Sequence, residues 1–406
     1  MNIEKLIIEC ENNAKSTFEK IDSVAYENQV KVLGAFQNNK VALRHFAPTT
    51  GYGYDDIGRD TLCSVFAEIF GAEKAIVSPL IASGTHAISL MLFAILRPND
   101  KMLSISGDVY DTLQDVISKS GIGSLKDYGV EFDKIELKNG EFDTKKIREY
   151  IKKSPPKVVF IQRSRGYNWR NAISIAQIKE ICSLVKSLAK NTIIAVDNCY
   201  GEFTDTVEPT QVGADICAGS MIKNPGGGLA PTGGYIAGRT DLVEMAGYRL
   251  TAPGVGMEVG SYAADYRPYY QGLFTAPHVT AQALKGAVLF SHLFSALGYE
   301  TLPETADAPN DIICSIKFKS ADELIDFCRT VQSVSPIDSH VTPYPWDMPG
   351  YNHQVIMAAG TFVQGASIEL SADSPIKEPY IAYLQGGLTY EHVRYAALKC
   401  AQALIK

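Results

Sequence analysis

The sequence predicts an α/β protein with a mostly parallel sheet sandwiched by helices, followed by a smaller α+β domain. From about residue 60, short apolar runs rich in β-branched residues alternate with segments of helical periodicity. This alternation is typical of βαβ units, whose strands are buried on both faces. After about residue 300 the segments become shorter and more mixed. The chain has no fixed-period repeat, which argues against solenoids and propellers.

The predicted elements group into three regions. Residues 1–45 begin with an amphipathic pattern and are expected to form an N-terminal helical segment. Residues 46–290 are expected to form the larger α/β domain. Apolar runs predict its strands, at 101–105, 157–162, 192–196, 214–218 and 234–238. Apolar residues spaced three and four apart predict its helices, at 60–69, 86–96, 111–119 and 175–189.

Residues 291–406 are expected to form the smaller C-terminal α+β domain. A helix predicted at 281–297 leads into it. The short elements expected there are 312–318, 354–358 and 366–370, with helices at 321–331 and 390–405.

The composition excludes several classes of protein. The 406 residues carry 45 acidic and 38 basic side chains, which predicts no general attraction to nucleic acid. No stretch reaches the roughly 18–20 consecutive apolar residues of a membrane helix, and charged residues interrupt any signal-peptide core at the start. The eight cysteines are scattered singly, and no His-Glu-x-x-His motif occurs. We therefore expect a cytoplasmic protein without a metal site and without nucleic-acid or membrane partners.

The first candidate site residues stand where predicted strands end, the edge at which open α/β sheets bind ligands. Ser83, Gly84 and Thr85 form a turn that opens a helix. Such a turn offers backbone N–H groups, two hydroxyls and the helix dipole to an anion, although an ordinary helix N-cap has the same sequence. Tyr110 follows a later strand and could stack on a heteroaromatic cofactor, or could simply be half-buried.

Asp197 and Lys223 follow two further predicted strands. A carboxylate at the end of a buried strand is tolerated mainly beside a cation, such as a protonated pyridine nitrogen. Capping of the next turn is the alternative for Asp197. The apolar strand before Lys223 is expected to lower the pKa of its amine, which could then form a Schiff base with an aldehyde. Ser220 could reach the same anion as the Ser83 turn.

The order of these features resembles that of fold-type-I pyridoxal 5′-phosphate (PLP) enzymes of the Cys/Met-metabolism group. The resemblance is closest to the methionine γ-lyase-like family often labelled aluminium-resistance proteins, and it extends from about residue 49 to residue 392. The segments that carry it are TTGYGYDDIGRDTL, SGTHA, QRSRGYNWR, VDNCYGEF, GSMIKNPGGGLAPTGGYI, YQGLFTAPH and YLQGGLTYEH.

This resemblance implies a fold-type-I PLP transferase-like fold and a role for each site residue. Lys223 would hold PLP as a Schiff base and shuttle protons, Asp197 would pair with the pyridine nitrogen, and Tyr110 would stack on the ring. The phosphate group would be held by Ser83, Gly84, Thr85 and Ser220. In related lyases a Tyr-x-Arg pair from the neighbouring subunit completes the phosphate site. The nearest match here, at a different spacing, is Tyr54 (or Tyr52) with Arg59, which implies a homodimer or homotetramer with shared active sites.

The chain departs from that group in its carboxylate site. Related lyases bind the substrate α-carboxylate with an arginine of the small domain, but the corresponding segment GASIELSAD has none. An arginine suits this task because its planar fork meets a carboxylate bidentately. We assign the role to Arg163 and Arg165, which follow a predicted strand, and regard surface salt bridges as their alternative role. Other candidates are Arg170, Arg267 and Lys377.

The resemblance implies a PLP-dependent carbon–sulfur lyase that acts on a sulfur-containing amino acid, similar to cystathionine β-lyase or methionine γ-lyase. Two alternatives remain open. One is another PLP enzyme of amino-acid metabolism, an aldolase or an aminotransferase. The other is a non-catalytic, stress-related PLP-binding protein, which the missing carboxylate arginine would suit.

Overall fold

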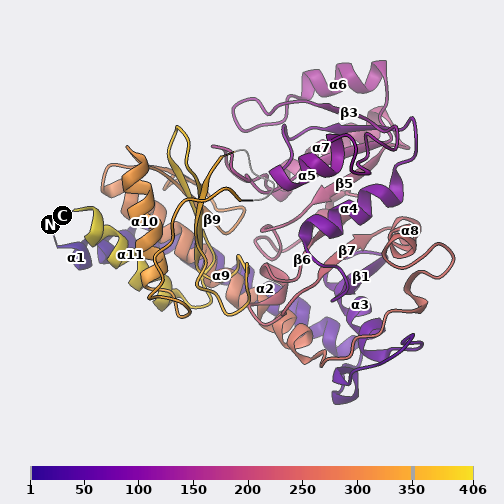
Figure 1. Ribbon diagram of the computed structural model, residues 1–406, viewed down its shortest axis with the longest axis horizontal. Coiled ribbons are helices and arrows are strands. Elements are labelled where there is room, and N and C mark those ends of the chain that lie inside the picture. Colours follow the sequence, from indigo (N-terminus) through magenta and orange to yellow (C-terminus); the bar gives the residue numbers. More distant parts are fainter. Residues whose placement is uncertain (1, 349–352, 406) are drawn as a thin grey trace.

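The computed structural model describes residues 2–348 and 353–405, and it contains two sheets side by side (Figure 1). The larger sheet has seven strands in the order β1-β7-β6-β5-β4-β2-β3. Strands β2 to β6 run parallel, whereas β7 pairs antiparallel with β6 and β1. The strands are β1 (Lys74–Ser78), β2 (Lys101–Ser104), β3 (Glu131–Lys134), β4 (Val158–Gln162), β5 (Ile193–Asp197), β6 (Ile216–Ser220) and β7 (Gly234–Gly238).

Helices cover both faces of this sheet, and the central strands are buried on both. In β5, Ile194 and Val196 belong to one hydrophobic cluster, and Ile193 and Ala195 belong to the cluster on the opposite face. This two-sided burial explains the continuous apolar runs in the sequence. One face packs against α4 (Gly84–Ile95), α5 (Asp111–Ser118) and α8 (Thr240–Leu250), and the other against α2 (Lys15–Asn38), α3 (Ile57–Ile69), α6 (Thr144–Lys153), α7 (Ile175–Leu188) and part of α9 (Arg267–Ala296).

The smaller sheet is antiparallel throughout, in the order β10-β11-β12-β9-β8. It packs with helices in a separate hydrophobic cluster. The elements of this part are β8 (Glu300–Leu302), β9 (Ile313–Lys317), α10 (Ala321–Ser333), β10 (Val355–Ala358), β11 (Ser371–Pro375), β12 (Ile381–Gln385) and α11 (Tyr390–Leu404). The mostly parallel α/β part and the α+β part agree with the predicted fold class.

Some predicted elements are shifted or missing. The segment 366–370 forms turns, and the strand begins only at Ser371. Ile368 and Leu370 are nevertheless fully buried, so the apolar run reflects burial of a loop. Strands β1, β3, β8 and β12 were not predicted.

One long helix joins the two parts. The 30-residue helix α9 buries Leu273 in the large core and Phe294 in the small one. The predicted domain boundary at residue 290 therefore falls inside a helix. The N-terminal helix α1 (Ile3–Asn13) packs on α9 and α11, with Ile7 fully buried in the small core. Figure 1 accordingly places the two ends of the chain together.

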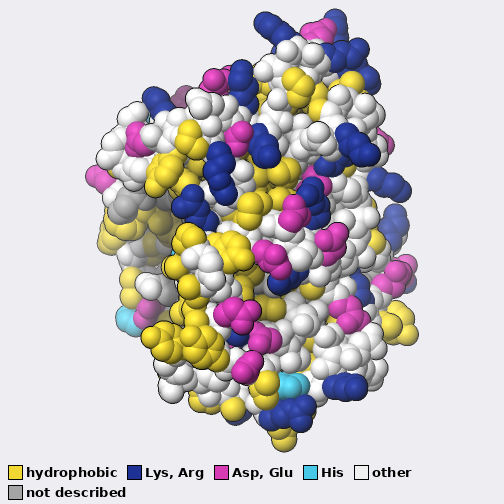
Figure 2. Space-filling model, turned by 90° about the vertical axis from the view of Figure 1, so that its right-hand side faces the viewer, with side chains coloured by type: hydrophobic (Ala, Val, Ile, Leu, Met, Phe, Trp, Pro, Cys, Tyr) yellow, Lys and Arg dark blue, Asp and Glu magenta, His cyan; other side chains and the backbone are white. Residues whose placement is uncertain are grey.

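The surface gives two further observations. None of the helices in the described ranges is both long and apolar enough to cross a membrane. On the face shown in Figure 2, basic and acidic side chains are interspersed among uncharged ones.

Candidate active site

A cavity of about 290 Å³ lies between the carboxyl ends of the central parallel strands and the smaller sheet. Side chains that follow β4, β5 and β6 line one side, and residues of β10, β11 and β12 line the other. Seven of the residues predicted from the sequence meet in this cavity: Ser83, Gly84, Thr85, Tyr110, Asp197, Ser220 and Lys223.

The Ser83 turn forms the N-terminus of helix α4. Ser83 is the N-cap, and its Oγ accepts a hydrogen bond from His86 N at 3.1 Å. The capping role and an open anion-binding turn therefore coexist. A Cβ added at Gly84 would lie 3.3 Å from both Cys199 Sγ and Ser220 Cβ, so the turn closely approaches the ends of β5 and β6. The backbone N–H groups and hydroxyls of this turn lie together at the N-terminus of α4, which is the positive end of its helix dipole.

Asp197 is the last residue of β5, and it is buried. Its Oδ1 accepts a hydrogen bond from Cys199 N at 3.1 Å, and no described residue forms an ion pair with it. Burial raises the pKa of Asp197, while the Lys223 charge and the hydrogen bond from Cys199 oppose the rise. A carboxylate in this position gains from a bound cation.

Lys223 lies just beyond β6, with its Nζ 3.9 Å from the centroid of the Tyr200 ring. Burial alone lowers its pKa, but the acidic groups of Cys199, Tyr200 and Asp197 outweigh burial and hold the pKa above its usual range. The lowered pKa expected from the sequence is therefore wrong for the protein alone. The apolar strand precedes Lys223 in the chain, but acidic groups surround its amine in space.

Aromatic and polar residues that the sequence reasoning missed complete the cavity. Tyr110 N donates to Gln162 Oε1 at 2.6 Å. The Tyr110 ring lies 5.9 Å from that of Tyr167, which in turn lies 5.1 Å from the ring of Tyr383. Tyr200 has a backbone φ of 70°, an uncommon conformation for a residue other than glycine. The position of Tyr200 directly after the Asp-Asn-Cys sequence at the end of β5 could have indicated it.

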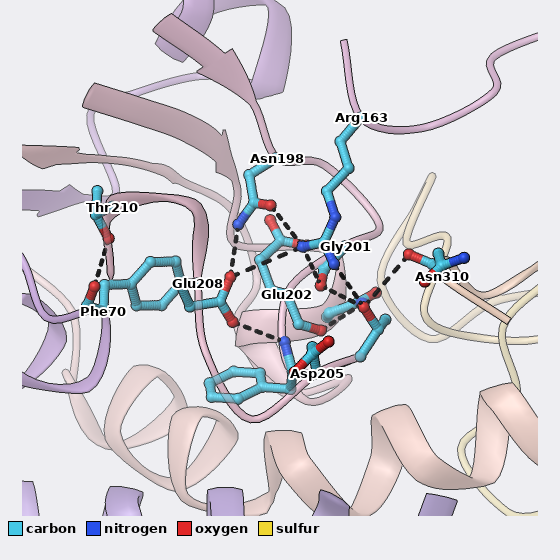
Figure 3. A network of polar contacts seen from close by, with 12 residues as sticks. Phe70, Arg163, Asn198, Gly201, Glu202, Asp205, Glu208, Thr210 and Asn310 are labelled. Carbon is cyan, nitrogen blue, oxygen red and sulfur yellow. Dashed lines mark hydrogen bonds and ion pairs between the residues drawn. The ribbon is translucent and has the colours of Figure 1, made fainter. Parts of the chain in front are cut away.

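The two predicted carboxylate-binding arginines do not line the cavity, and each has other partners. Arg163 donates to Asn198 Oδ1 at 2.9 Å and to Gly201 O at 2.7 Å, within the buried network around Glu208 (Figure 3). Arg165 forms an ion pair with Asp311 at 3.0 Å, and both side chains are at most 1% exposed. From its position after β4, Arg163 holds the large part of the chain together, and Arg165 joins the large part to the small part.

Tyr54 and Arg59 also lie outside the cavity lining. Tyr54 is 64% exposed, and its ring packs on that of Tyr52 at 5.4 Å. Arg59 is buried and bonds to Asp60 and to the Gly53 carbonyl. Within one chain, therefore, neither residue reaches the Ser83 turn.

Comparison with known proteins identifies the family. A family model described as methionine gamma-lyase matches residues 3–405. The chain belongs to the methionine gamma-lyase family. The protein YnbB of Bacillus subtilis is 47% identical over 408 residues, covering 100% of this chain and 97% of that protein.

Solved structures extend the comparison. A carbon–sulfur lyase involved in aluminium resistance from Clostridium novyi is 49% identical, covers 100% of this chain and 96% of that one, and has a TM-score of 0.95. A candidate cystathionine beta-lyase involved in aluminium resistance from Listeria innocua is 51% identical over 99% of both chains, with a TM-score of 0.96. The PLP-dependent protein YhfS of Escherichia coli, 15% identical over 94% of this chain and 97% of its own, shares the fold at a TM-score of 0.64.

The family implies a PLP cofactor, and the cavity residues fit one. The Ser83 turn and Ser220 provide an anion cradle that a side chain at Gly84 would fill. No described residue forms an ion pair with the buried carboxylate of Asp197, and a protonated pyridine nitrogen would give it a partner. The amine of Lys223 and the ring of Tyr110 line the same space.

Proposed function

We propose that this protein is a PLP-dependent carbon–sulfur lyase that acts on a sulfur-containing amino acid. The proposal depends mainly on one observation: Lys223, Asp197, Tyr110 and the Ser83 turn line one cavity in a chain of the methionine gamma-lyase family. The names of the Clostridium novyi and Listeria innocua relatives favour the same reaction class. Cleavage would release a thiol, ammonia and a 2-oxo acid.

Each residue has a distinct task in this reaction. PLP, when bound, would withdraw electrons from the substrate Cα and so make its proton acidic. Asp197 would keep the pyridine nitrogen protonated, because the buried carboxylate favours a nearby positive charge. The N–H groups of the Ser83 turn and the hydroxyl of Ser220 would bind the phosphate, and Tyr110 would orient the ring by stacking.

Lys223 would take the Cα proton at its Nζ and return a proton later in the cycle. It must first lose its own proton, and its acidic surroundings oppose this step as long as Asp197 lacks another cation. Pairing Asp197 with a pyridinium would weaken the hold of Asp197 on the Lys223 charge.

We further propose that the protein works as a homodimer or a larger homo-oligomer. The exposed rings of Tyr52 and Tyr54 lie on the molecular surface, where they could reach the phosphate of a neighbouring subunit. The buried Arg59 could join them only after exchanging its bonds to Gly53 and Asp60.

The test is a Lys223→Ala variant, with Lys319→Ala as a control that removes an exposed lysine elsewhere. Wild type and the control are expected to show the visible absorption of lysine-bound PLP and to release thiol and 2-oxo acid in equal amounts from at least one of cysteine, cystathionine and methionine. Lys223→Ala should lose both properties. Retention of both by Lys223→Ala would contradict the assignment. Product without thiol would instead favour an aldolase or an aminotransferase.

A further inference from the structure

The cavity contains few charges, and most of them are negative. Among its described lining residues, the lysine, aspartate and glutamate side chains are Lys223, Asp197 and Asp373, and no arginine is present. Under the proposed function, Lys223 and Asp197 serve the cofactor. Asp373 is the charged group that remains for the substrate.

Asp373 lies in the middle of β11, opposite Tyr383 of β12. Gln385 Nε2 donates a hydrogen bond to Asp373 Oδ2 at 3.0 Å. No described residue donates to Oδ1, and none forms an ion pair with the carboxylate. Burial raises the pKa of Asp373 to about 6, and the Gln385 hydrogen bond and the Lys223 charge oppose the rise. The group is therefore mostly ionised at neutral pH, with one oxygen fixed by Gln385 and the other open to a ligand.

The surroundings indicate that this ligand is a cation. Arg163 and Arg165 lie outside the cavity lining and pair with Glu208 and Asp311, and the charge that acts on the Asp373 carboxylate is that of Lys223. A substrate carboxylate beside Asp373 would be repelled, whereas an ammonium would form a charge-assisted hydrogen bond. The ring of Tyr383 lies beside Asp373 on the small sheet, and the ring of Tyr167 faces it from the other side of the cavity at 5.1 Å; both rings can also attract a cation.

We propose that Asp373 selects substrates whose leaving thiol carries an ammonium group. The inference rests on the proposed lyase function and names its substrate class: thioether amino acids with a second amino group. This second group is distinct from the α-amino group, which reacts at the cofactor beside Lys223. Lys223 and Asp373 are not within ion-pair distance of each other, although the Lys223 charge acts on Asp373 across the cavity.

The experiment compares three probes that differ only at the far end of the thioether. S-(2-aminoethyl)-L-cysteine carries an ammonium, S-propyl-L-cysteine is its neutral counterpart, and S-(2-carboxyethyl)-L-cysteine is anionic. The homocysteine series is tested in parallel, so that cleavage at Cβ and at Cγ are both covered. With water, each cysteine probe would yield its thiol, pyruvate and ammonia, and free thiol is measured in the holoenzyme.

Wild type should prefer the aminoethyl probe over the propyl probe in kcat/KM by about ten- to one-hundred-fold, the range of a hydrogen bond between charged groups. In Asp373→Asn this preference should disappear, mainly through a rise in KM for the aminoethyl probe, so that the ratio of kcat/KM for the aminoethyl and propyl probes falls to about one. Asp108→Asn, which removes an exposed carboxylate from the adjoining cavity, should keep the preference. If Asp373→Asn does not fold, Asp373→Ser replaces it.

Three results would overturn the proposal: equal use of the aminoethyl and propyl probes by wild type, an equal loss for both probes in Asp373→Asn, or the same loss of preference in Asp108→Asn. Failure of the lyase function is distinguishable, because then no probe releases thiol. In that case calorimetric titration of the holoenzyme decides the role of Asp373. Tighter binding of the aminoethyl probe to wild type than to Asp373→Asn supports it, and equal binding refutes it.

Discussion

Replacing Arg165 with methionine tests whether this arginine joins the two parts of the chain or binds substrate. Its guanidinium donates to both carboxylate oxygens of Asp311, at 3.0 and 3.3 Å, and to the Leu302 carbonyl at 2.7 Å. Arg165 follows β4 of the large sheet. In the small sheet, Leu302 is the last residue of β8, and Asp311 lies just before β9. Methionine keeps much of the length and removes the charge.

The magnitude follows from burial. Arg165 and Asp311 are 1% and 0% exposed, so the substitution removes the ion-pair partner of a buried carboxylate. Breaking a buried pair in this way costs about 3–5 kcal/mol in the free energy of unfolding. The double variant Arg165→Met/Asp311→Asn should recover part of that loss, because it removes the orphaned charge as well. Arg267→Met is the matched control. It breaks an exposed pair with Asp265, which is worth about 0–1 kcal/mol.

Urea unfolding of the holoenzymes, followed by circular dichroism, measures these differences. The proposed role requires a large loss for Arg165→Met, a partial recovery in the double variant, and an unchanged KM for substrate in whatever fraction stays folded. An Arg165→Met protein as stable as wild type, with KM raised tenfold or more, would refute the reasoning and restore Arg165 as the carboxylate-binding residue.

Two further predictions concern buried groups near the cofactor site. Burial raises the pKa of Glu202 from 4.5 to about 8, so the folded state holds this proton more tightly and wild type loses stability as the pH rises from about 5 to 8. Glu202→Gln should not lose stability in this way. Its free energy of unfolding in urea, relative to that of wild type, should rise by up to about 1.4 kcal/mol for each pH unit. A difference that does not change with pH would contradict the assignment. Gly84→Ala should fold normally but bind PLP at least tenfold more weakly in a fluorescence titration, because its Cβ would enter the anion cradle; unchanged affinity would place the phosphate elsewhere.

The sequence was most informative where burial is uniform. The strands at 157–162 and 192–196 are predicted almost to the residue, because their side chains are apolar on both faces. The segment 366–370 misled for the same reason, since a buried loop is as apolar as a strand. Strand β12 contains Tyr383 and Gln385, which face the cavity, and their polarity hid it. Functional demands on a strand thus weaken the pattern by which it is found.

The candidate site was predictable from the sequence only in its cofactor half. The Ser83 turn, Asp197 and Lys223 each follow a strand of one parallel sheet, and the common edge of that sheet brings them together. Asp373 and Gln385 come from antiparallel strands of the other sheet, for which no such rule exists. The predicted pKa direction of Lys223 was wrong because the acidic groups that follow the neighbouring strand β5 approach its amine, and the segment before Lys223 in the chain does not show them.

The balance of charge in the cavity gives a physical reason for an oligomer. Near neutral pH a phosphate group adds roughly two negative charges, and Asp197 and Asp373 already line the space. Lys223 is the one lysine or arginine among the described lining residues. Its amine would bond to the cofactor, so its charge would not be available to balance the phosphate. Helix α4 supplies only a partial positive charge of about one half. A pyridinium can balance Asp197 and a substrate ammonium can balance Asp373, but the phosphate still needs a cation. We therefore expect a neighbouring subunit to supply that cation.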